Sequence, residues 1–403
     1  MFKNKETKEP HEKEGKISRK EQILEAAFDL TRTSKQWSLA EVAQKIGVSK
    51  TALYRHFKNK AEIEEEMNSQ FLTGLVELIE KTEENPETLR NAAVSFFRKN
   101  NGYLFLVINN MYSKQNYEDF LFEELRKRSK KIAEWTDHYL NACENEKDIF
   151  TTEIMKNVAS VMIAGFDVPE MEKIQSELLV LLKEGFTTSL SSNSIPNEQR
   201  LLELQKECEL FPQDIDSGNK VFNSIAATIH EYGIGGTTIR RIAEKMGSAK
   251  SSLYFYFDNK EKMLMELVRQ ETGTILQLYI KRSEIGKTFL EQLFIIMMIQ
   301  ANYLLLKPDF MPVFNWIRYE TINIDPKKDP SHFDHFSFLS HFKYQDLLGS
   351  EKQSAIRALA AIKWASMLST TTITQDQRHN ADPDRSHKKI RLMFHSMMSG
   401  DKN

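Results

Sequence analysis

The sequence has little of what secreted, fibrous or polycationic proteins depend on. Its 403 residues include 2 cysteines, too few for a disulfide framework or a four-thiolate zinc site. Glycine (15) and proline (10) occur at about half their usual frequency, which excludes collagen-like and low-complexity chains and favours helix. The formal net charge of −2 excludes a chain that is basic throughout, so only a local patch can attract nucleic acid. The scarcity of cysteine favours a reducing, cytoplasmic location.

Long uncharged apolar runs are also missing. Residues 1–16 contain no apolar segment that could serve as a signal sequence, so we expect a disordered tail there. The densest apolar stretch, Leu290 to Leu306, is interrupted by four polar residues and is shorter than the roughly 18 to 20 apolar residues that cross a bilayer. The sequence therefore predicts a buried helix at this place and no membrane partner.

The common catalytic motifs are absent as well. The chain has no P-loop, no G-x-S-x-G and no H-E-x-x-H run, and neither Cys143 nor Cys208 has a histidine beside it in sequence. His332, His335 and His341 lack the spacing of a metal-ligand set on a helix. We therefore expect no enzyme, no metal and no cofactor.

An internal repeat organises the chain. Residues 38–60 (SLAEVAQKIGVSKTALYRHFKNK) align without gaps to residues 238–260 (TIRRIAEKMGSAKSSLYFYFDNK), and nine of the aligned pairs are identical. The offset of 200 residues is about half the chain and too long for a solenoid repeat. The sequence thus predicts two tandem units of domain size.

The repeated segment has the pattern of a helix-turn-helix. Ser38 and Glu41 form the pattern of a capping box, and the apolar residues that follow have the spacing of a helix over 39–46. Gly47 supplies the left-handed conformation that ends a helix, and Ser49 is placed to cap a second short helix. Two short helices joined at a glycine turn are typical of this DNA-binding motif.

The outer face of the second short helix has groups that suit duplex DNA. Lys50 and Arg55 can donate to guanine edges or phosphates, Thr51 can contact a thymine methyl or a phosphate, and Tyr54 can donate to a phosphate. Residues 16–60 carry a formal charge of +6 and residues 218–260 carry +3, which leaves −11 on the rest of the chain. Two basic segments at matching positions in an acidic chain are the pattern of a nucleic-acid interface.

Both segments resemble the DNA-binding domain of the TetR family of bacterial transcriptional regulators. The resemblance rests on the run G-V-S-K-x-x-L-Y-x-H-F-x-N-K, present at Gly47 to Lys60 and less faithfully at Gly247 to Lys260. It covers about 50 residues in each half. It implies an all-α fold of two tandem TetR-like units. Each unit has an N-terminal helix-turn-helix domain of three helices, followed by a helical bundle that binds a small molecule and supplies dimer contacts.

The resemblance also implies which residues contact DNA. Together with Arg55, which the chemistry of the exposed face indicates, the predicted DNA-binding residues of the first copy are Ser38, Lys50, Thr51, Tyr54, Arg55, His56 and Lys60. Those of the second copy are Thr238, Arg240, Lys250, Ser251, Tyr254, Tyr256 and Lys260. Asn59 and Asn259 are placed to cap the helices that begin at the two lysines. Ser38 and Thr238 have the alternative role of helix caps only.

The second copy departs from the motif where DNA would be read. Ser248 and Ala249 replace Val48 and Ser49, and Phe255 and Tyr256 replace Arg55 and His56. Its recognition surface is more aromatic and less charged, which indicates either a different base preference or a lost reader.

The repeat and the composition of the intervening segments predict six segments. These are a tail (1–16), the first helix-turn-helix domain (17–62), the first helical regulatory domain (63–192), a partly ordered connector (193–217), the second helix-turn-helix domain (218–262) and the second regulatory domain (263–403). Paired helices are expected at the end of each half, at 150–166 with 169–190 and at 354–372 with 385–398. Because such pairs form the dimer interface in the family resembled, we expect the halves to pair as an intrachain pseudo-dimer. A homodimer of whole chains is the alternative.

The expected function is a DNA-binding transcriptional regulator, a repressor by analogy with the family, with double-stranded DNA and a small-molecule effector as partners. Residues 293–299 with Gln300 and Asn302, and Trp316 with Tyr319, could line an effector pocket, although an ordinary helix core explains the same residues. Two alternatives stay open. One is an architectural protein that binds DNA without sequence preference, and the other is a regulator in which the second motif is a protein-interaction surface.

Overall fold

The fold is all-helical, as the sequence predicts. The computed structural model describes residues 17–33, 37–83, 86–113, 117–141, 172–186, 195–215, 219–249, 253, 257, 259–311, 335–347, 349–378 and 382–399. No β-strand occurs among these residues, and helices account for most of them. The expected tail at 1–16 and the expected helix at 150–166 lie outside the described residues. The chain divides into two compact units, residues 1–73 and 74–403, and each is described by itself.

The first unit is a small three-helix domain continued by a longer helix. It contains α1 (Arg19–Thr33), α2 (Leu39–Lys45), α3 (Lys50–Leu53) and the first part of α4 (Lys60–Lys81). Its core forms because each helix contributes apolar residues at helical spacing. Those residues are fully buried, namely Ile23, Leu24, Ala26, Ala27, Val42, Ala43, Leu53, Phe57, Ile63 and Met67.

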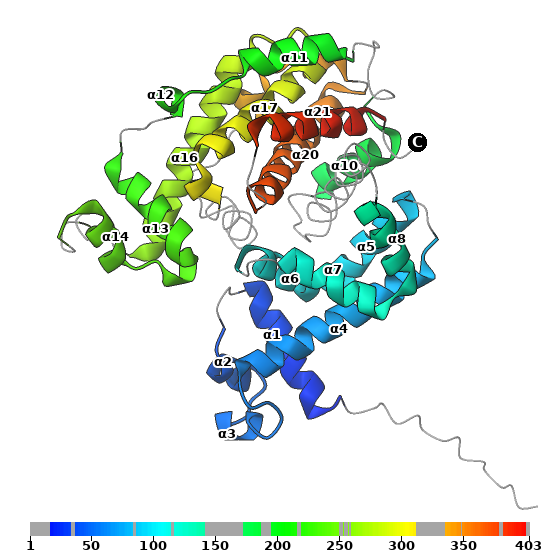
Figure 1. The fold of residues 1–403 in the computed structure, drawn as a ribbon, viewed down its shortest axis with the longest axis vertical. Helices are drawn as coiled ribbons and strands as arrows, with labels where there is room; N and C mark the ends of the chain where they lie inside the picture. Colours follow the sequence, from blue (N-terminus) through cyan, green and yellow to red (C-terminus); the bar gives the residue numbers. More distant parts are fainter. Residues whose placement is uncertain are drawn as a thin grey trace, which may run out of the picture. The chain divides into compact units, whose positions relative to one another are not determined.

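The second unit begins with the helices that belong to the first half of the sequence. They are α5 (Pro86–Lys99), α6 (Asn101–Ser113), α7 (Tyr117–Arg128), α8 (Lys130–Asn141) and α10 (Glu172–Glu184) (Figure 1). Ser129 sits between α7 and α8 and accepts a hydrogen bond from the backbone N–H of Ile132, so it starts α8. Lys131 donates to the carbonyl oxygens of Ile79 and Thr82, which ties α8 to the end of α4.

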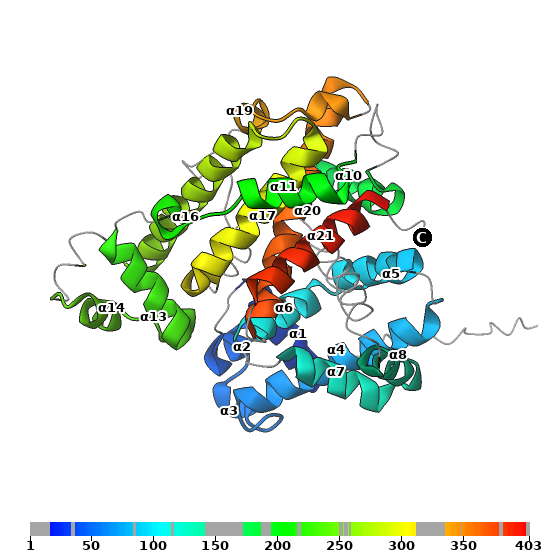
Figure 2. The same ribbon diagram turned by 45° about the horizontal axis from the view of Figure 1, so that its top comes forward.

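The helices of the second half complete this unit (Figure 2). They are α11 (Glu198–Glu207), α12 (Pro212–Ile215), α13 (Lys220–Gly236), α14 (Ile239–Met246), α16 (Lys260–Ser283), α17 (Phe289–Leu306), the 3₁₀ turn η3 (Pro308–Phe310), α19 (His335–Leu339), the 3₁₀ turn η4 (Tyr344–Asp346), α20 (Glu351–Arg378) and α21 (Pro383–Ser399). The predicted terminal pair of this half is present as α20 and α21.

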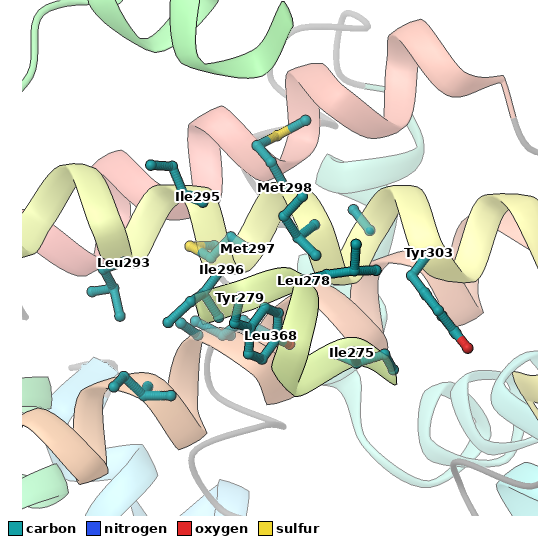
Figure 3. Close-up of a cluster of buried hydrophobic side chains, with 14 of the residues drawn as sticks. Ile275, Leu278, Tyr279, Leu293, Ile295, Ile296, Met297, Met298, Tyr303 and Leu368 are labelled. Atoms are coloured by element: carbon teal, nitrogen blue, oxygen red, sulfur yellow. The ribbon is translucent and has the colours of Figure 1, made fainter. Parts of the chain in front are cut away.

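Helix α17 is the centre of the second unit. It is long and apolar enough to cross a membrane by length and composition, yet 89% of its apolar window is buried among other helices. It packs against α11, α16, α20 and α21. In Figure 3 its Ile295 and Met298 point to one side of the helix, whereas Leu293 and Tyr303 point to the other. A helix that is apolar all round is expected at such a buried position, and the predicted buried helix is confirmed.

One helix of the first half packs against the second half. Leu178, Leu181 and Leu182 of α10 are fully buried in the same core cluster as α17 and α20. Phe186, directly after α10, stacks on Trp364 of α20 with ring centroids 6.4 Å apart. The polar edge of the contact is an ion pair, in which Arg357 Nε donates to Glu177 Oε2 at 2.9 Å.

The predicted connector contains a helix that is docked on the second half. Leu201 and Leu204 of α11 are fully buried. Arg200 forms a two-point ion pair with Glu291 at the start of α17, with N···O distances of 3.2 and 3.0 Å. Burial opposes the charge of Glu291, but the guanidinium of Arg200 and the backbone N–H of Lys287 outweigh it and bring the pKa of Glu291 below its ordinary value. Residues 198–207 are therefore part of a packed domain.

A buried hydrogen-bond network fixes the end of α11. Asn302 of α17 donates from Nδ2 to the carbonyl oxygen of Cys208 at 2.8 Å, and its Oδ1 lies 2.7 Å from Nε2 of His387. Gln205 Nε2 lies 3.4 Å from Nδ1 of the same imidazole, while Arg391 donates to Gln205 Oε1. These partners assign the proton to Nε2 and leave Nδ1 as an acceptor, so the network requires a neutral histidine.

This network predicts a pH dependence of stability. Burial lowers the pKa of His387, against the raising effect of the carboxylates of Asp384, Glu209 and Asp382 and with the lowering effect of Arg391. A histidine that stays neutral in the folded state contributes to stability at pH values above the ordinary pKa of about 6.5. This contribution is lost as the pH falls through and below that value, because the unfolded chain then binds a proton that the folded chain does not.

We expect the wild-type protein to lose thermal stability relative to a His387→Gln variant as the pH is lowered from about 7.5 to 5.5. Unfolding midpoints from circular dichroism at matched pH values measure the difference. His395→Gln is the control, because that imidazole is half-exposed and pairs with the exposed carboxylate of Glu198. A constant gap between His387→Gln and wild type over this range contradicts the assignment.

Candidate nucleic-acid interface

The first helix-turn-helix is built by local signals that the structure confirms. Ser38 accepts a hydrogen bond from the backbone N–H of Glu41, and the Glu41 carboxylate accepts from the backbone N–H of Ser38, so the capping box is complete. Hydrogen bonds from the hydroxyl and the backbone N–H of Ser38 lower the pKa of Glu41, and the charge of Lys60 adds to this effect. Gly47 ends α2 with φ of +68°, a conformation that favours glycine. Ser49 caps α3 by accepting from Ala52 N.

The predicted contact residues on α3 and the turn after it are exposed together. Lys50, Thr51, Tyr54, Arg55 and His56 are all on the surface, while Leu53 and Phe57 between them are buried in the domain core. Tyr54 is 45% exposed, unusually high for an aromatic residue, and the Lys50 ammonium lies 5.9 Å from its ring centroid.

This surface keeps its positive charge available. In the part of the chain that the structure describes, no carboxylate lies within ion-pair distance of Lys50, Arg55 or His56. A major groove accommodates a helix with such side chains, and the free cations can contact phosphates or base edges.

The remaining two predicted residues of the first copy have partners inside the domain. The Ser38 hydroxyl both accepts from the Glu41 backbone and donates to the Glu41 carboxylate, so the structure shows it in the capping role. Lys60 is the first residue of α4, where Asn59 accepts from Glu62 N as the predicted cap. Its side chain is 37% exposed and lies 3.5 Å from the carboxylate of Glu64.

One residue beside this interface was missed by sequence reasoning. Trp37 precedes the capping box and is 5% exposed, and the ammonium of Lys60 lies 4.5 Å from its ring centroid. The only signal in the sequence is a large aromatic residue directly before a helix cap, and the spacing of the two residues does not show that they meet.

The second helix-turn-helix repeats the same local construction. Thr238 caps α14 by accepting from Arg241 N, Gly247 ends it with φ of +66°, and Asn259 caps α16 by accepting from Lys262 N. Leu253 is buried, and Phe222 and Phe257 are in ring contact. Lys250, Ser251, Tyr254 and Tyr256 lie outside the described residues, as does the side chain of Lys260.

The basic residues of α14 have partners within the second domain. Arg240 pairs with Glu244 at 2.8 Å, and Lys245 pairs with Glu231 at 2.7 Å. Arg241 lies 4.2 Å from the ring centroid of Tyr232. Of the predicted contacts of this copy that the structure describes, Thr238 is a helix cap and Arg240 is an exposed but paired cation.

The second domain also contacts the helical core behind it. Helix α13 packs against η3, the turn that follows α17, and His230 Nδ1 lies 3.5 Å from Asp309 Oδ1. Just before this turn, Lys307 pairs with the buried carboxylate of Glu271 at 2.9 Å. The end of α17 is thereby fixed to both α13 and α16.

The residues proposed to line an effector pocket behave as core. Gln300 accepts a hydrogen bond from the hydroxyl of Tyr279 and donates to Thr370 Oγ1 at 3.2 Å. The amide nitrogen of Asn302 donates to the carbonyl oxygen of Cys208, and its amide oxygen pairs with His387. Trp316 and Tyr319 lie outside the described residues. Within the described part of the chain, no group of three or more histidine, cysteine or acidic residues could hold a metal ion.

In comparisons with known proteins, both motifs match the same family. The model of "Bacterial regulatory proteins, tetR family" matches residues 34–67 and 223–267. The chain is 42% identical over 69 residues to the nucleoid occlusion factor SlmA of Alteromonas mediterranea, which is 17% of this chain and 31% of that protein. It is 39% identical over 70 residues to SlmA of Vibrio cholerae, 17% of this chain and 32% of that one.

A third relative, SlmA of Shewanella oneidensis, is 39% identical over 69 residues, again 17% of this chain and 31% of the relative. The chain thus spans about a third of the length of the curated relatives it matches. The two family matches coincide with the two capped helix-turn-helix motifs that the structure contains. The chain therefore carries twice the DNA-binding type of domain that is found in the tetR family of bacterial regulatory proteins.

Proposed function

We propose that the protein is a cytoplasmic DNA-binding transcriptional repressor, released by a small-molecule effector, whose two halves act as a covalent pseudo-dimer on an operator with two unlike half-sites. The six-segment division of the chain and the fourteen DNA contacts predicted above are part of this proposal. The packing of α10 against α20 is the observation that carries it, because it joins a helix of the first half to the terminal pair of the second.

The contact has the composition of a stable interface. Three fully buried leucines of α10 and the Phe186–Trp364 stack form its apolar centre, and the Glu177–Arg357 ion pair lies at its edge. Burial of a leucine side chain contributes about 1.5 to 3 kcal/mol by area, so this centre outweighs the ion pair. An apolar centre with a polar edge supports the view that the terminal helices pair within one chain.

Two features support an operator with unlike halves. Within the described residues, no carboxylate lies within ion-pair distance of Lys50 or Arg55 of the first motif, whereas Arg240 of the second motif pairs with Glu244. The replacement of Arg55 and His56 by Phe255 and Tyr256 changes the groups that would meet the bases.

The loss of Arg55 and His56 from the second motif also fits one alternative, in which only the first motif reads DNA and the second contacts a protein. The relatives are named nucleoid occlusion factors, so the experiments below also test the architectural alternative.

Selection of bound duplexes from a random pool tests the operator. We expect two different half-sites whose centres are one helical turn or a multiple apart, since two joined readers impose that spacing. Arg55→Phe should change the preferred sequence at one half-site only. A perfectly symmetric site contradicts the unlike readers, a single half-site supports the alternative with one reader, and no enrichment supports the architectural alternative.

The pseudo-dimer predicts that one chain is the DNA-binding unit. Light scattering should give the mass of one chain, 46.9 kDa, for the free protein, and one chain per operator in the complex. A clean two-chain mass contradicts the intrachain pairing.

Charge reversal tests whether the α10–α20 contact matters for binding. Glu177→Arg or Arg357→Glu alone should weaken operator affinity, because each places like charges at a contact whose side chains are 18% and 11% exposed. The double exchange should restore it. Glu266→Arg is the matched control, since its pair with Arg269 is on the surface, where ion pairs contribute little to stability.

Lys60 is assigned to a phosphate and not to a base. Lys60→Ala should weaken binding to all duplexes alike and reduce the slope of log affinity against log salt by about 1. Lys206→Ala, an exposed cation on α11, should leave the slope unchanged. A loss on one sequence only contradicts the phosphate assignment.

A further inference from the structure

The indole of Trp37 has a fixed orientation in the first helix-turn-helix domain. Its Nε1 donates to Thr31 Oγ1 at 2.8 Å, and the Thr31 hydroxyl donates in turn to the carbonyl oxygen of Ala27 at 2.8 Å. Both side chains are buried, at 5% and 3% exposure. Because the donor of the ring is used in this chain of hydrogen bonds to α1, the plane of the indole is set by α1 and cannot turn freely.

The face of this ring holds the ammonium of Lys60. Lys60 Nζ lies 4.5 Å from the ring centroid, within the range of a cation–π contact. On another side the ammonium meets the carboxylate of Glu64 at 3.5 Å. The lysine stem is half-buried, so the charged end occupies a defined place at the first turn of α4.

We propose that Trp37 is a positioning residue that holds the Lys60 ammonium in place for a DNA phosphate at the N-terminus of α4. This inference rests on the proposed DNA-binding function and assigns a role to a residue outside the predicted contacts. The ring attracts the cation through its π face and uses none of its N–H donors, so the contact with the ring does not compete with a phosphate for them. A free lysine loses much rotamer freedom when it binds, whereas one already held loses less.

Glu64 has the opposite effect on the same ammonium. Its carboxylate competes with a phosphate for the ammonium, and its negative charge repels the DNA backbone. The ring and the carboxylate are therefore distinguishable: removal of the ring should weaken DNA binding through Lys60, and Glu64→Gln should strengthen it.

The second copy lacks this arrangement in sequence. Thr237 stands at the position of Trp37, so the second copy has no indole at this position. The positioned lysine is thus a property of the first reader, and Trp37→Thr gives the first copy the residue that the second has.

A double-mutant cycle with a short random-sequence duplex tests the proposal, because a phosphate contact needs no operator. The affinities of wild type, Trp37→Thr, Lys60→Ala and the double variant are measured at several salt concentrations. We expect Trp37→Thr to lower affinity about two- to fivefold. No further loss should appear when Lys60 is already alanine. Additive losses overturn the proposal.

Lys58 provides the matched control. It precedes Lys60 by two residues, its side chain is 86% exposed, and it pairs with Glu62 at 3.7 Å. In the corresponding cycle with Lys58→Ala, the effect of Trp37→Thr should be undiminished. Coupling of equal size at both lysines shows a general disturbance of the domain and counts against a positioning role.

Two further experiments separate the positioning role from a folding defect and from a failure of the proposed function. One uses a second variant at position 37, and the other needs no DNA. Trp37→Phe keeps an aromatic face and should retain part of the affinity that Trp37→Thr loses, with circular dichroism as the folding check. In selectively ¹³C-labelled free protein, the ring current of Trp37 should shift the ε-methylene protons of Lys60 upfield. An unshifted Lys60 resonance in wild type overturns the positioning, whereas a shifted resonance with no duplex binding at low salt overturns the proposed function instead.

Discussion

The arrangement of the second unit depends on apolar burial around α17. Residues 289–304 of this helix are buried and the helix packs against α11, α16, α20 and α21, while α20 in turn receives the leucine side chains of α10. Since burial of apolar area is the largest favourable contribution to folding, this shared core joins elements from both halves of the sequence more firmly than any ion pair at its edge. The polar residues on α17 keep this core specific, because Gln300 and Asn302 each have hydrogen-bond partners on other helices.

The helix-turn-helix domains could be predicted because their signals are local. Ser38 and Glu41, Gly47, and Ser49 each act on backbone groups a few residues away, so their spacing in sequence is also their spacing in space. The same reasoning identified Asn59 and Asn259 as caps, which the structure confirms. The exposed positions on α3 followed from the same helical period.

The contacts between distant segments could not be predicted in this way. Glu177 and Arg357 are 180 residues apart, and nothing in either neighbourhood indicates the other. In a sequence, a polar residue within an apolar helix looks the same whether its side chain binds a ligand or bonds to a neighbouring helix. The sequence therefore left Gln300 as a candidate pocket residue, whereas the structure shows its hydrogen bonds to Tyr279 and Thr370. Trp37 and Lys60 belong to the same class, because their meeting depends on how α1 and α4 pack.

The ion pair between Glu177 and Arg357 joins two helices of different sequence, so neither residue faces a copy of itself. In a symmetric dimer each interface residue appears twice and must suit both of its roles, so a single substitution changes two contacts. Here a substitution on α10 changes one contact and leaves α20 with its own sequence. In the intrachain pairing that we propose, mutation can therefore act on each side of the α10–α20 contact separately, and the two halves can diverge without pairing with a wrong partner.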